Sequence, residues 1–129
     1  MKGIYCLIIF LNKSKNIRIG KRKKLFPKGY YCYVGSALNN LEKRIQRHYS
    51  KRKKFHWHID YFLKHARIVD TVIKTNSKDE CDLSRKIKSL GGRVTLKGFG
   101  SSDCKCDTHL YYFPKKSIDK AKILNNKKL

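Results

Sequence analysis

Gly3-Ile4-Tyr5-Cys6-Leu7-Ile8-Ile9-Phe10-Leu11 is a mostly apolar run close to the start of the sequence, and it predicts the first strand of the fold. It is rich in β-branched and aromatic residues and ends at a polar cluster, residues 12–16, which is typical of a strand that stops at a turn. A second run of the same kind follows at Tyr30-Tyr31-Cys32-Tyr33-Val34-Gly35. Because such residues favour β-sheet, we predict that the two runs pair as antiparallel strands.

The rest of the chain predicts a few further elements around this strand pair. The basic segment from Ile17 to Gly29 indicates a partly ordered hairpin arm. Helical spacing of apolar residues predicts a first helix over 37–50, with Leu38, Leu41, Ile45 and Tyr49 on one face, and a short second helix over 57–65. The remaining predicted elements are a strand from Ile68 to Thr75, a third helix and a strand from His109 to Phe113. The third helix has Asn76 or Ser77 as its N-cap and Asp79 and Glu80 in its first turn, and it ends at Gly91-Gly92.

These elements predict an α/β fold of the α+β kind, in which helices flank a small, mainly three-stranded antiparallel sheet. A chain of 129 residues is one domain's worth of polypeptide. We assign residues 1–113 to this domain and treat 114–129 as a basic tail that either belongs to it or frays.

Charge is the most unusual feature of the composition. The chain has 32 Lys and Arg against 9 Asp and Glu, a formal net charge of +23. A field of this size favours a polyanion as partner, and we expect nucleic acid, DNA before RNA. The alternatives are an anionic membrane surface, or a lysine-rich composition that has no binding role. No run of about 18 apolar residues is present, so we expect no membrane span and no signal peptide, and a cytoplasmic protein.

The residues that could carry chemistry lie on the predicted strands and helices. Tyr5 and Tyr33, on adjacent strands, would present their hydroxyls to one spot as direct cross-strand neighbours. Arg44 and His48 are four residues apart and so share a helix face. Glu80, at the start of another helix, would be a hard oxygen ligand for Mg²⁺ or Mn²⁺. Together they could supply the base, the cation and the metal that phosphodiester hydrolysis requires.

The order G-I-Y, Y-V-G, R-x-x-x-H and then a helix-borne Glu resembles the GIY-YIG nuclease superfamily. The sequences of residues 29–37, 56–61 and 98–104 resemble a small, mainly archaeal branch of that superfamily. Members of this branch are found as a free-standing domain or beside a DNA glycosylase-lyase domain. The chain departs from the common pattern in three ways. The two tyrosine motifs are further apart, Val34 replaces the usual Ile, and the Asn that often follows the metal-binding Glu has no clear equivalent, Asp103 being the candidate.

The resemblance implies a role for each matching residue. It implies that Tyr5 is the general base or the water-orienting group, with Tyr33 as its hydrogen-bonding companion. Arg44 would stabilise the pentacoordinate phosphate, His48 would assist proton handling, and Glu80 would bind the single divalent metal. The products would carry a 5′-phosphate and a 3′-hydroxyl.

The function expected from these observations is metal-dependent endonuclease cleavage of DNA, in repair of damaged or abasic sites and in association with a DNA glycosylase or lyase. The alternative is a non-catalytic DNA- or RNA-binding module on the same fold. A third, weaker interpretation is a zinc-binding structural protein within a ribonucleoprotein.

Two basic runs and Arg47 are expected to contact backbone phosphates. The phosphate-binding candidates are Lys21, Arg22, Lys23, Lys24, Arg47, Lys51, Arg52, Lys53 and Lys54. Accessory candidates near the site are Gly35, Ser36, His56, His58 and Asp103. The sequence pattern H-x-H-x-D at His56, His58 and Asp60 is also known from metal-dependent hydrolases. We favour instead a helix that starts there, with the histidines lining a groove.

The five cysteines are odd in number and not densely spaced, so we expect reduced thiols. Cys104, Cys106 and His109 lie close together in sequence and could bind zinc with His56 or His58. C-x-C followed by x-x-H is not a common zinc spacing, so small buried thiols are the favoured interpretation and zinc is not expected.

Overall fold

The computed structural model describes residues 2–75, 80–101 and 106–124. In chain order its elements are β1 (Gly3–Leu11), β2 (Lys15–Ile19), β3 (Arg22–Phe26), β4 (Gly29–Ala37), α1 (Leu41–Tyr49), α2 (His58–Leu63), β5 (Arg67–Thr75), α3 (Glu80–Ser89), β6 (Arg93–Val94), β7 (Leu110–Phe113) and α4 (Lys120–Leu124). Within these ranges, no helix is both long enough and apolar enough to cross a membrane.

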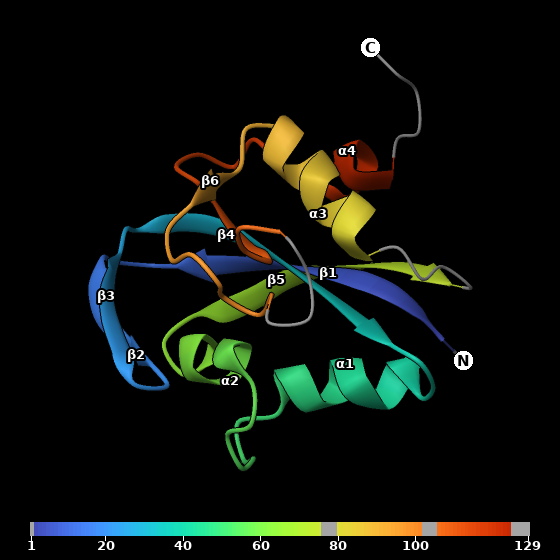
Figure 1. Cartoon of the computed structure of the whole chain (residues 1–129), viewed down its shortest axis with the longest axis horizontal. Coiled ribbons are helices and arrows are strands. Elements are labelled where there is room, and N and C mark those ends of the chain that lie inside the picture. Colours follow the sequence, from blue (N-terminus) through green and yellow to red (C-terminus); the bar gives the residue numbers. More distant parts are fainter. Residues whose placement is uncertain (1, 76–79, 102–105, 125–129) are drawn as a thin grey trace.

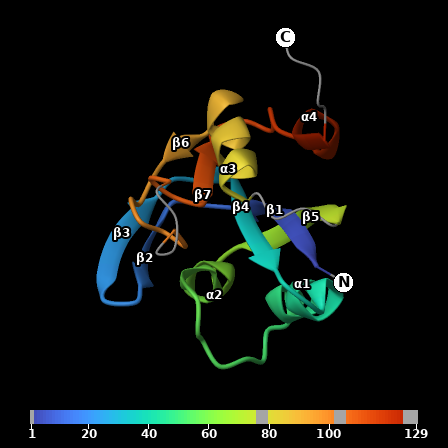
Figure 2. The ribbon, with the colours of Figure 1, turned by 45° about the vertical axis from the view of Figure 1, so that its right-hand side comes forward.

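The central sheet has five strands in the order β5-β1-β4-β7-β6, and every paired neighbour is antiparallel. The α+β class is therefore confirmed, but the mainly three-stranded sheet is wrong. One of the added strands, β6, is only two residues long, too short for any periodicity to indicate it. β2 and β3 form a separate two-stranded sheet, the predicted hairpin arm, which lies beside α2 (Figure 2).

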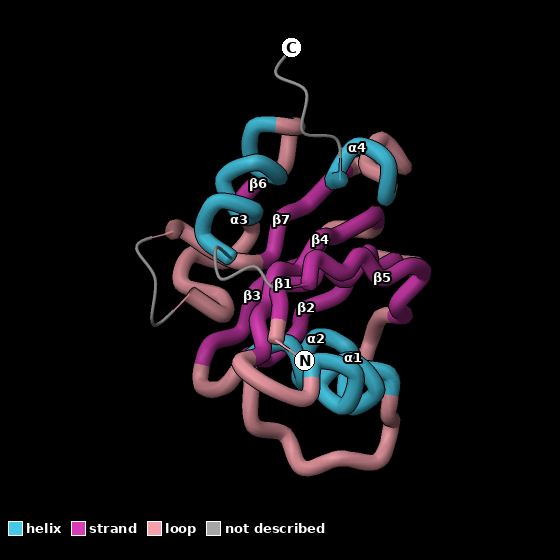
Figure 3. Tube along the Cα trace, turned by 90° about the vertical axis from the view of Figure 1, so that its right-hand side faces the viewer, coloured by secondary structure: helices cyan, strands magenta, loops and turns pink. Residues whose placement is uncertain are grey.

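Helices cover both faces of the central sheet, α1 and α2 on one side and α3 and α4 on the other (Figures 1 and 3). Side chains alternate between faces along a strand, and β1 is buried on both. Tyr5 and Leu7 belong to the apolar cluster that includes α1, α2 and the hairpin. Ile4 and Cys6 belong to the cluster formed with α3 and α4. The alternation thus puts Tyr5 on the α1 and α2 side.

The first helix begins later than its periodicity predicts, at Leu41 rather than Ala37. Gly35 to Ala37 continue β4 and pair with Tyr5 to Gly3, so the backbone hydrogen bonds of the sheet take these residues away from the helix. Leu38, predicted on the buried face, is 85% exposed. Asn40 has a left-handed backbone (φ 51°), a conformation in which Asn is common, and it turns the chain into α1.

The basic tail contributes to the core as far as the structure describes it. Ile118 and Ile123 are buried in the same cluster as Leu83 of α3. These two residues of the tail therefore pack into the core on the α3 side of the sheet.

Candidate active site

The register of β1 and β4 brings the two tyrosine motifs together. Tyr5 lies opposite Gly35, and Tyr33 lies opposite Leu7. The two tyrosines are therefore diagonal neighbours on one face rather than the direct cross-strand pair predicted from sequence. A Cβ atom at position 35 would collide with the Tyr5 hydroxyl. The glycine of Y-V-G is required because the Tyr5 ring passes over it.

The Tyr5 hydroxyl is hydrogen-bonded to Nε2 of His48, with 2.6 Å between the two atoms. Burial raises the pKa of Tyr5 well above its ordinary value, and the nearby Arg44 offsets this only in part. Burial likewise lowers the pKa of His48 to about 3, and the positive charge of Lys53 acts in the same direction. Both groups are neutral near pH 7, and in the tautomer that carries its proton on Nδ1 the imidazole accepts the hydrogen bond from the phenol.

Arg44 points from α1 toward the end of β4. Its Nη1 donates to the backbone carbonyl of Ser36 at 3.0 Å. Its guanidinium carbon lies 4.3 Å from the centre of the Trp57 ring, within the range of a cation–π contact. A guanidinium fixed by both contacts presents a positive charge beside Tyr5 at little further entropic cost.

Glu80 reaches the same place from the opposite face, as the first residue of α3. The Ser36 hydroxyl donates to Glu80 Oε1 at 3.2 Å, and Nδ1 of His109 lies 3.6 Å from Oε2. A carboxylate also suits the positive end of a helix dipole. Glu80 is thus oriented toward β4 rather than away from the tyrosines.

One open cavity of about 270 Å³ collects these side chains. Its lining residues are Tyr5, Tyr33, Gly35, Ser36, Arg44, His56, Trp57, His58, Glu80 and Gly100. His48 is absent from this lining and is 2% exposed, so it lies behind Tyr5 rather than in the cavity. The predicted convergence of Tyr5, Tyr33, Arg44 and Glu80 is therefore present, with His48 as a supporting group.

Asp60, the third member of H-x-H-x-D, fixes the wall of the cavity. It is fully buried and accepts hydrogen bonds from both terminal nitrogens of Arg47, each at 2.9 Å, and from the backbone N–H groups of His56 and Trp57. Burial alone would raise the pKa of Asp60, but these hydrogen bonds outweigh it and lower the pKa to about 2. Asp60 is an anchor for the segment that carries the histidines, and the sequence did not indicate that role.

The two histidines of that segment line the cavity, and α2 begins at His58, as the favoured sequence interpretation predicts. His58 Nδ1 accepts the backbone N–H of Gly100 at 3.0 Å, and Gly100 has the left-handed φ of 65° that glycine tolerates. Trp57 and Gly100 were missed as site residues. Asp103 and Cys104, like the proposed N-caps Asn76 and Ser77, lie outside the described residues.

The predicted phosphate-binding cations divide into two groups. Residues 21–24 of the hairpin are exposed, as are Lys51, Arg52 and Lys54. Lys53 instead donates to the carbonyls of Arg47 and His48 at the end of α1, and its side chain is 8% exposed. Arg47 is bound to Asp60. Arg22 and Lys51 also donate to backbone carbonyls, of Lys97 and Leu63, but they remain exposed. The exposed group is therefore better placed than Arg47 and Lys53 to meet a polyanion.

The fold and site define a small, strongly basic α+β protein with a tyrosine–histidine–arginine–glutamate cavity at one end of an antiparallel sheet. A family model described as Domain of unknown function DUF123 matches residues 4–128, and the chain belongs to that family. No curated protein and no solved structure matches the chain.

The buried neutral imidazole of His48 makes stability depend on pH. Its pKa is lowered from 6.5 to about 3 in the folded protein, so at acidic pH the unfolded chain binds one more proton at this residue. The His48 contribution to the free energy of unfolding is present above pH 6.5 and is lost as pH falls toward 3, with a limiting slope of about 1.4 kcal/mol per pH unit.

We therefore expect His48→Gln to have a shallower acid dependence of stability than the wild type. The measurement is urea unfolding at several pH values between about 3 and 7, the window set by the folded and unfolded pKa values of that histidine. His56→Gln, at an exposed histidine, serves as the control and should keep the wild-type slope. Equal slopes for His48→Gln and wild type would contradict a neutral buried His48.

Proposed function

We propose that this protein is a metal-dependent endonuclease that hydrolyses phosphodiester bonds in DNA, as its resemblance to the GIY-YIG nucleases implies. The observation that carries the proposal is the lining of a single cavity by Tyr5, Tyr33, Arg44 and Glu80. These residues are distant in sequence and reach the cavity from both faces of the sheet. Their convergence is what a phosphoryl-transfer site needs, namely an oriented nucleophile and positive charge at one phosphate.

In this proposal Tyr5 orients the attacking water. A neutral phenol can accept a proton from water while it gives its own proton to Nε2 of His48, to which it is already hydrogen-bonded. Because the raised pKa of Tyr5 keeps it protonated, a preformed tyrosinate is not the base. His48 would hold the Tyr5 hydroxyl in place and assist proton handling, as the resemblance implies, while its lowered pKa keeps it neutral before the reaction.

Tyr33 and Arg44 would act on the phosphate. Burial raises the pKa of Tyr33, so its hydroxyl is a neutral hydrogen-bond donor at the cavity wall. Arg44 places a permanent charge there, and a guanidinium matches the geometry of phosphate oxygens. Charge that develops on those oxygens would be stabilised by groups that need no reorganisation.

The donor set also fits the Mg²⁺ or Mn²⁺ that the resemblance implies. These ions commonly use one or two carboxylates together with water and substrate phosphate oxygens. Glu80 would hold the ion, since its carboxylate lines the cavity and is 31% exposed. The bound ion would supply additional positive charge at the phosphate.

Nucleic acid is the proposed substrate because exposed cations lie on the hairpin and on the connector after α1. The resemblance to the GIY-YIG nucleases puts DNA first. Repair of damaged or abasic sites, in association with a DNA glycosylase or lyase, follows from the resemblance to the branch found beside such domains. RNA is the second candidate, and residence in the cytoplasm is part of the same proposal.

The test is incubation of intact, nicked, abasic and branched duplexes with the protein and Mg²⁺ or Mn²⁺. We expect cleavage of at least one substrate, with 5′-phosphate and 3′-hydroxyl ends, and loss of cleavage on chelation. Glu80→Gln should remove the stimulation by divalent metal because it removes the anionic ligand. Glu42→Gln, at an exposed first-turn glutamate of α1, is the matched control and should cleave like wild type.

The alternative, a non-catalytic binding module, predicts a different result with the same materials. It predicts DNA or RNA binding that weakens steeply with salt and is indifferent to chelator and to Glu80→Gln. Salt-dependent binding without cleavage of any duplex by the wild type would replace the nuclease proposal with this one.

A further inference from the structure

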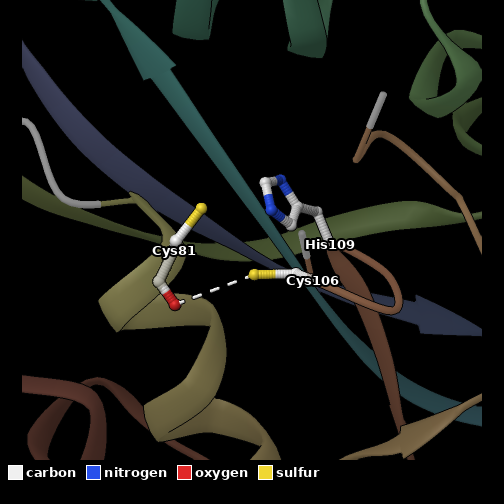
Figure 4. Close-up of side chains that lie close together, drawn as sticks. All are labelled: Cys81, Cys106 and His109. Carbon is white, nitrogen blue, oxygen red and sulfur yellow. Dashed lines mark hydrogen bonds between the residues drawn. The ribbon is translucent and has the colours of Figure 1, made fainter. Parts of the chain in front are cut away.

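A cluster of sulfur and imidazole ligands lies next to the proposed nuclease cavity. Cys81 is in the first turn of α3, and Cys106 and His109 lie on the segment that leads into β7. One ligand atom from each residue lies within 4.8 Å of the other two. Figure 4 shows the His109 ring beside the two sulfur atoms. We propose that Cys81, Cys106 and His109 bind a Zn²⁺ ion.

The state of His109 supports a ligand at this position. The residue is 2% exposed, and neither ring nitrogen has a hydrogen-bond partner among the described residues. A buried polar group left without a partner costs about 1–3 kcal/mol. A metal ion would satisfy one of the two nitrogens in a place that water hardly reaches.

The second nitrogen of His109 has a natural role in such a site. Nδ1 lies 3.6 Å from Oε2 of Glu80, which leaves Nε2 for the metal. Histidines that bind metals usually donate their other N–H to a carboxylate or carbonyl, which fixes the tautomer and the ring orientation. His109 would thus contact the Glu80 carboxylate on the side of the zinc site, while Glu80 also lines the cavity.

The chemistry of the donor set selects the metal. Thiolate sulfur with imidazole nitrogen is the ligand combination of structural zinc sites, whereas Mg²⁺ and Mn²⁺ prefer oxygen. The three residues would occupy three positions of a tetrahedral ion. The site is therefore distinct in kind from the oxygen-ligand site proposed at Glu80, and it fixes the start of α3 to the segment before β7.

The zinc-binding form requires reduction, because Cys81 is disulfide-bonded in this structure. A thiol reductant gives two electrons to the disulfide and is itself oxidised, which releases the Cys81 sulfur as a thiol. The thiols of Cys81 and Cys106 then lose their protons to the solvent as they bind Zn²⁺. Thiol reductants of this class keep cysteines reduced in a cytosol.

This proposal replaces the sequence interpretation of the Cys104, Cys106 and His109 cluster as small buried thiols without zinc, and it changes the candidate ligand set. The histidine partners suggested from sequence were His56 or His58, but both lie in the nuclease cavity. Cys81, which is 25 residues before Cys106 in sequence, takes their place. Cys104 lies outside the described residues and is not part of the proposed set.

Metal content of the full chain tests the proposal without any nucleic acid, so its outcome is independent of the nuclease proposal. The protein is reduced with a phosphine, incubated with zinc chloride, desalted and analysed for zinc. We expect about one zinc per chain, and a loss of at least about tenfold in zinc affinity for Cys106→Ser and His109→Gln. Cys32→Ala, at a buried cysteine of β4 outside the cluster, is the control and should retain zinc.

Cobalt spectroscopy of the wild type decides the result even if a variant fails to fold. Co²⁺ in place of Zn²⁺ should give a thiolate-to-cobalt charge-transfer band and tetrahedral visible bands. Wild type that retains no zinc and shows no thiolate–cobalt band overturns the proposal, as does a Cys106→Ser variant that folds and binds zinc as tightly as wild type. Oxidation of the protein before zinc is added should abolish retention.

Discussion

Tyr5→Phe is expected to lower the rate of DNA cleavage by about 10²–10⁴-fold, the range that general acid–base catalysis contributes. The variant removes the hydroxyl that is hydrogen-bonded to His48 Nε2, while the ring that fills the space over Gly35 remains. Folding stability should fall by about 1–3 kcal/mol, because the buried Nε2 of His48 is left without its partner. Single-turnover cleavage with Mg²⁺ or Mn²⁺ measures the effect.

Tyr31→Phe is the matched control for this prediction. Tyr31 is also a buried tyrosine of the strand pair, but its hydroxyl donates to the carbonyl of Pro27 and lies outside the cavity. Its cleavage rate should equal that of the wild type. A Tyr5→Phe protein that cleaves at the wild-type rate rejects the role of Tyr5, and an equal loss in both variants attributes the effect to packing.

For the candidate site, the sequence could predict the strand or helix on which each residue lies. Tyr5 and Tyr33 fall on paired strands, Arg44 and His48 on one helix face, and Glu80 at a helix start. Each placement depends only on local periodicity and on the order of elements. Even here, Tyr5 and Tyr33 are diagonal neighbours and not the directly opposed pair that we predicted. The register of two strands depends on the backbone hydrogen bonds along their whole length, and the three-residue motifs do not specify it.

The start of α1 shows why local pattern alone fails at boundaries. The apolar spacing from Leu38 to Tyr49 fits a helix, yet Gly35 to Ala37 pair with β1, and the sheet takes precedence over the helix for these residues. The hydrogen bonds of a central ladder are long-range, so a helical pattern in a local window contains no sign of them. Exposure of Leu38 is the consequence.

Functional partners that meet only in three dimensions were the least predictable. The run Lys51–Lys54 is uniform in sequence, yet Lys53 is largely buried against the end of α1 while Lys54 is exposed. Cys81 and His109 meet because the first turn of α3 lies against the segment that leads into β7, a strand of the central sheet. Neither the burial of Lys53 nor the contact of Cys81 with His109 could be predicted from neighbouring residues, because the local sequence does not show which distant segment a side chain will contact.

Asp60 gives the clearest test of a tertiary anchor, because it is fully buried and holds one face of the cavity. Its carboxylate binds Arg47 through two hydrogen bonds, accepts two backbone N–H groups, and lies 3.8 Å from Lys53. Removal of one partner from a buried ion pair is strongly destabilising because a desolvated charge is left without compensation. We therefore expect Asp60→Asn to lower the free energy of unfolding by about 3–5 kcal/mol.

Urea unfolding at pH 7 measures this loss, with Asp82→Asn as the control. Asp82 is an exposed carboxylate paired with Arg85 on the surface of α3, so its substitution should cost no more than about 0.5 kcal/mol. The difference between Asp60→Asn and wild type should also depend on pH. The folded pKa of Asp60 is lowered from 3.8 to about 2, so its stabilisation is present above 3.8 and is lost as pH falls through 2. A loss at pH 7 as small as that of Asp82→Asn would mean that the Arg47–Asp60 contact does not hold the His56–Trp57 segment, and the cavity wall would need another anchor.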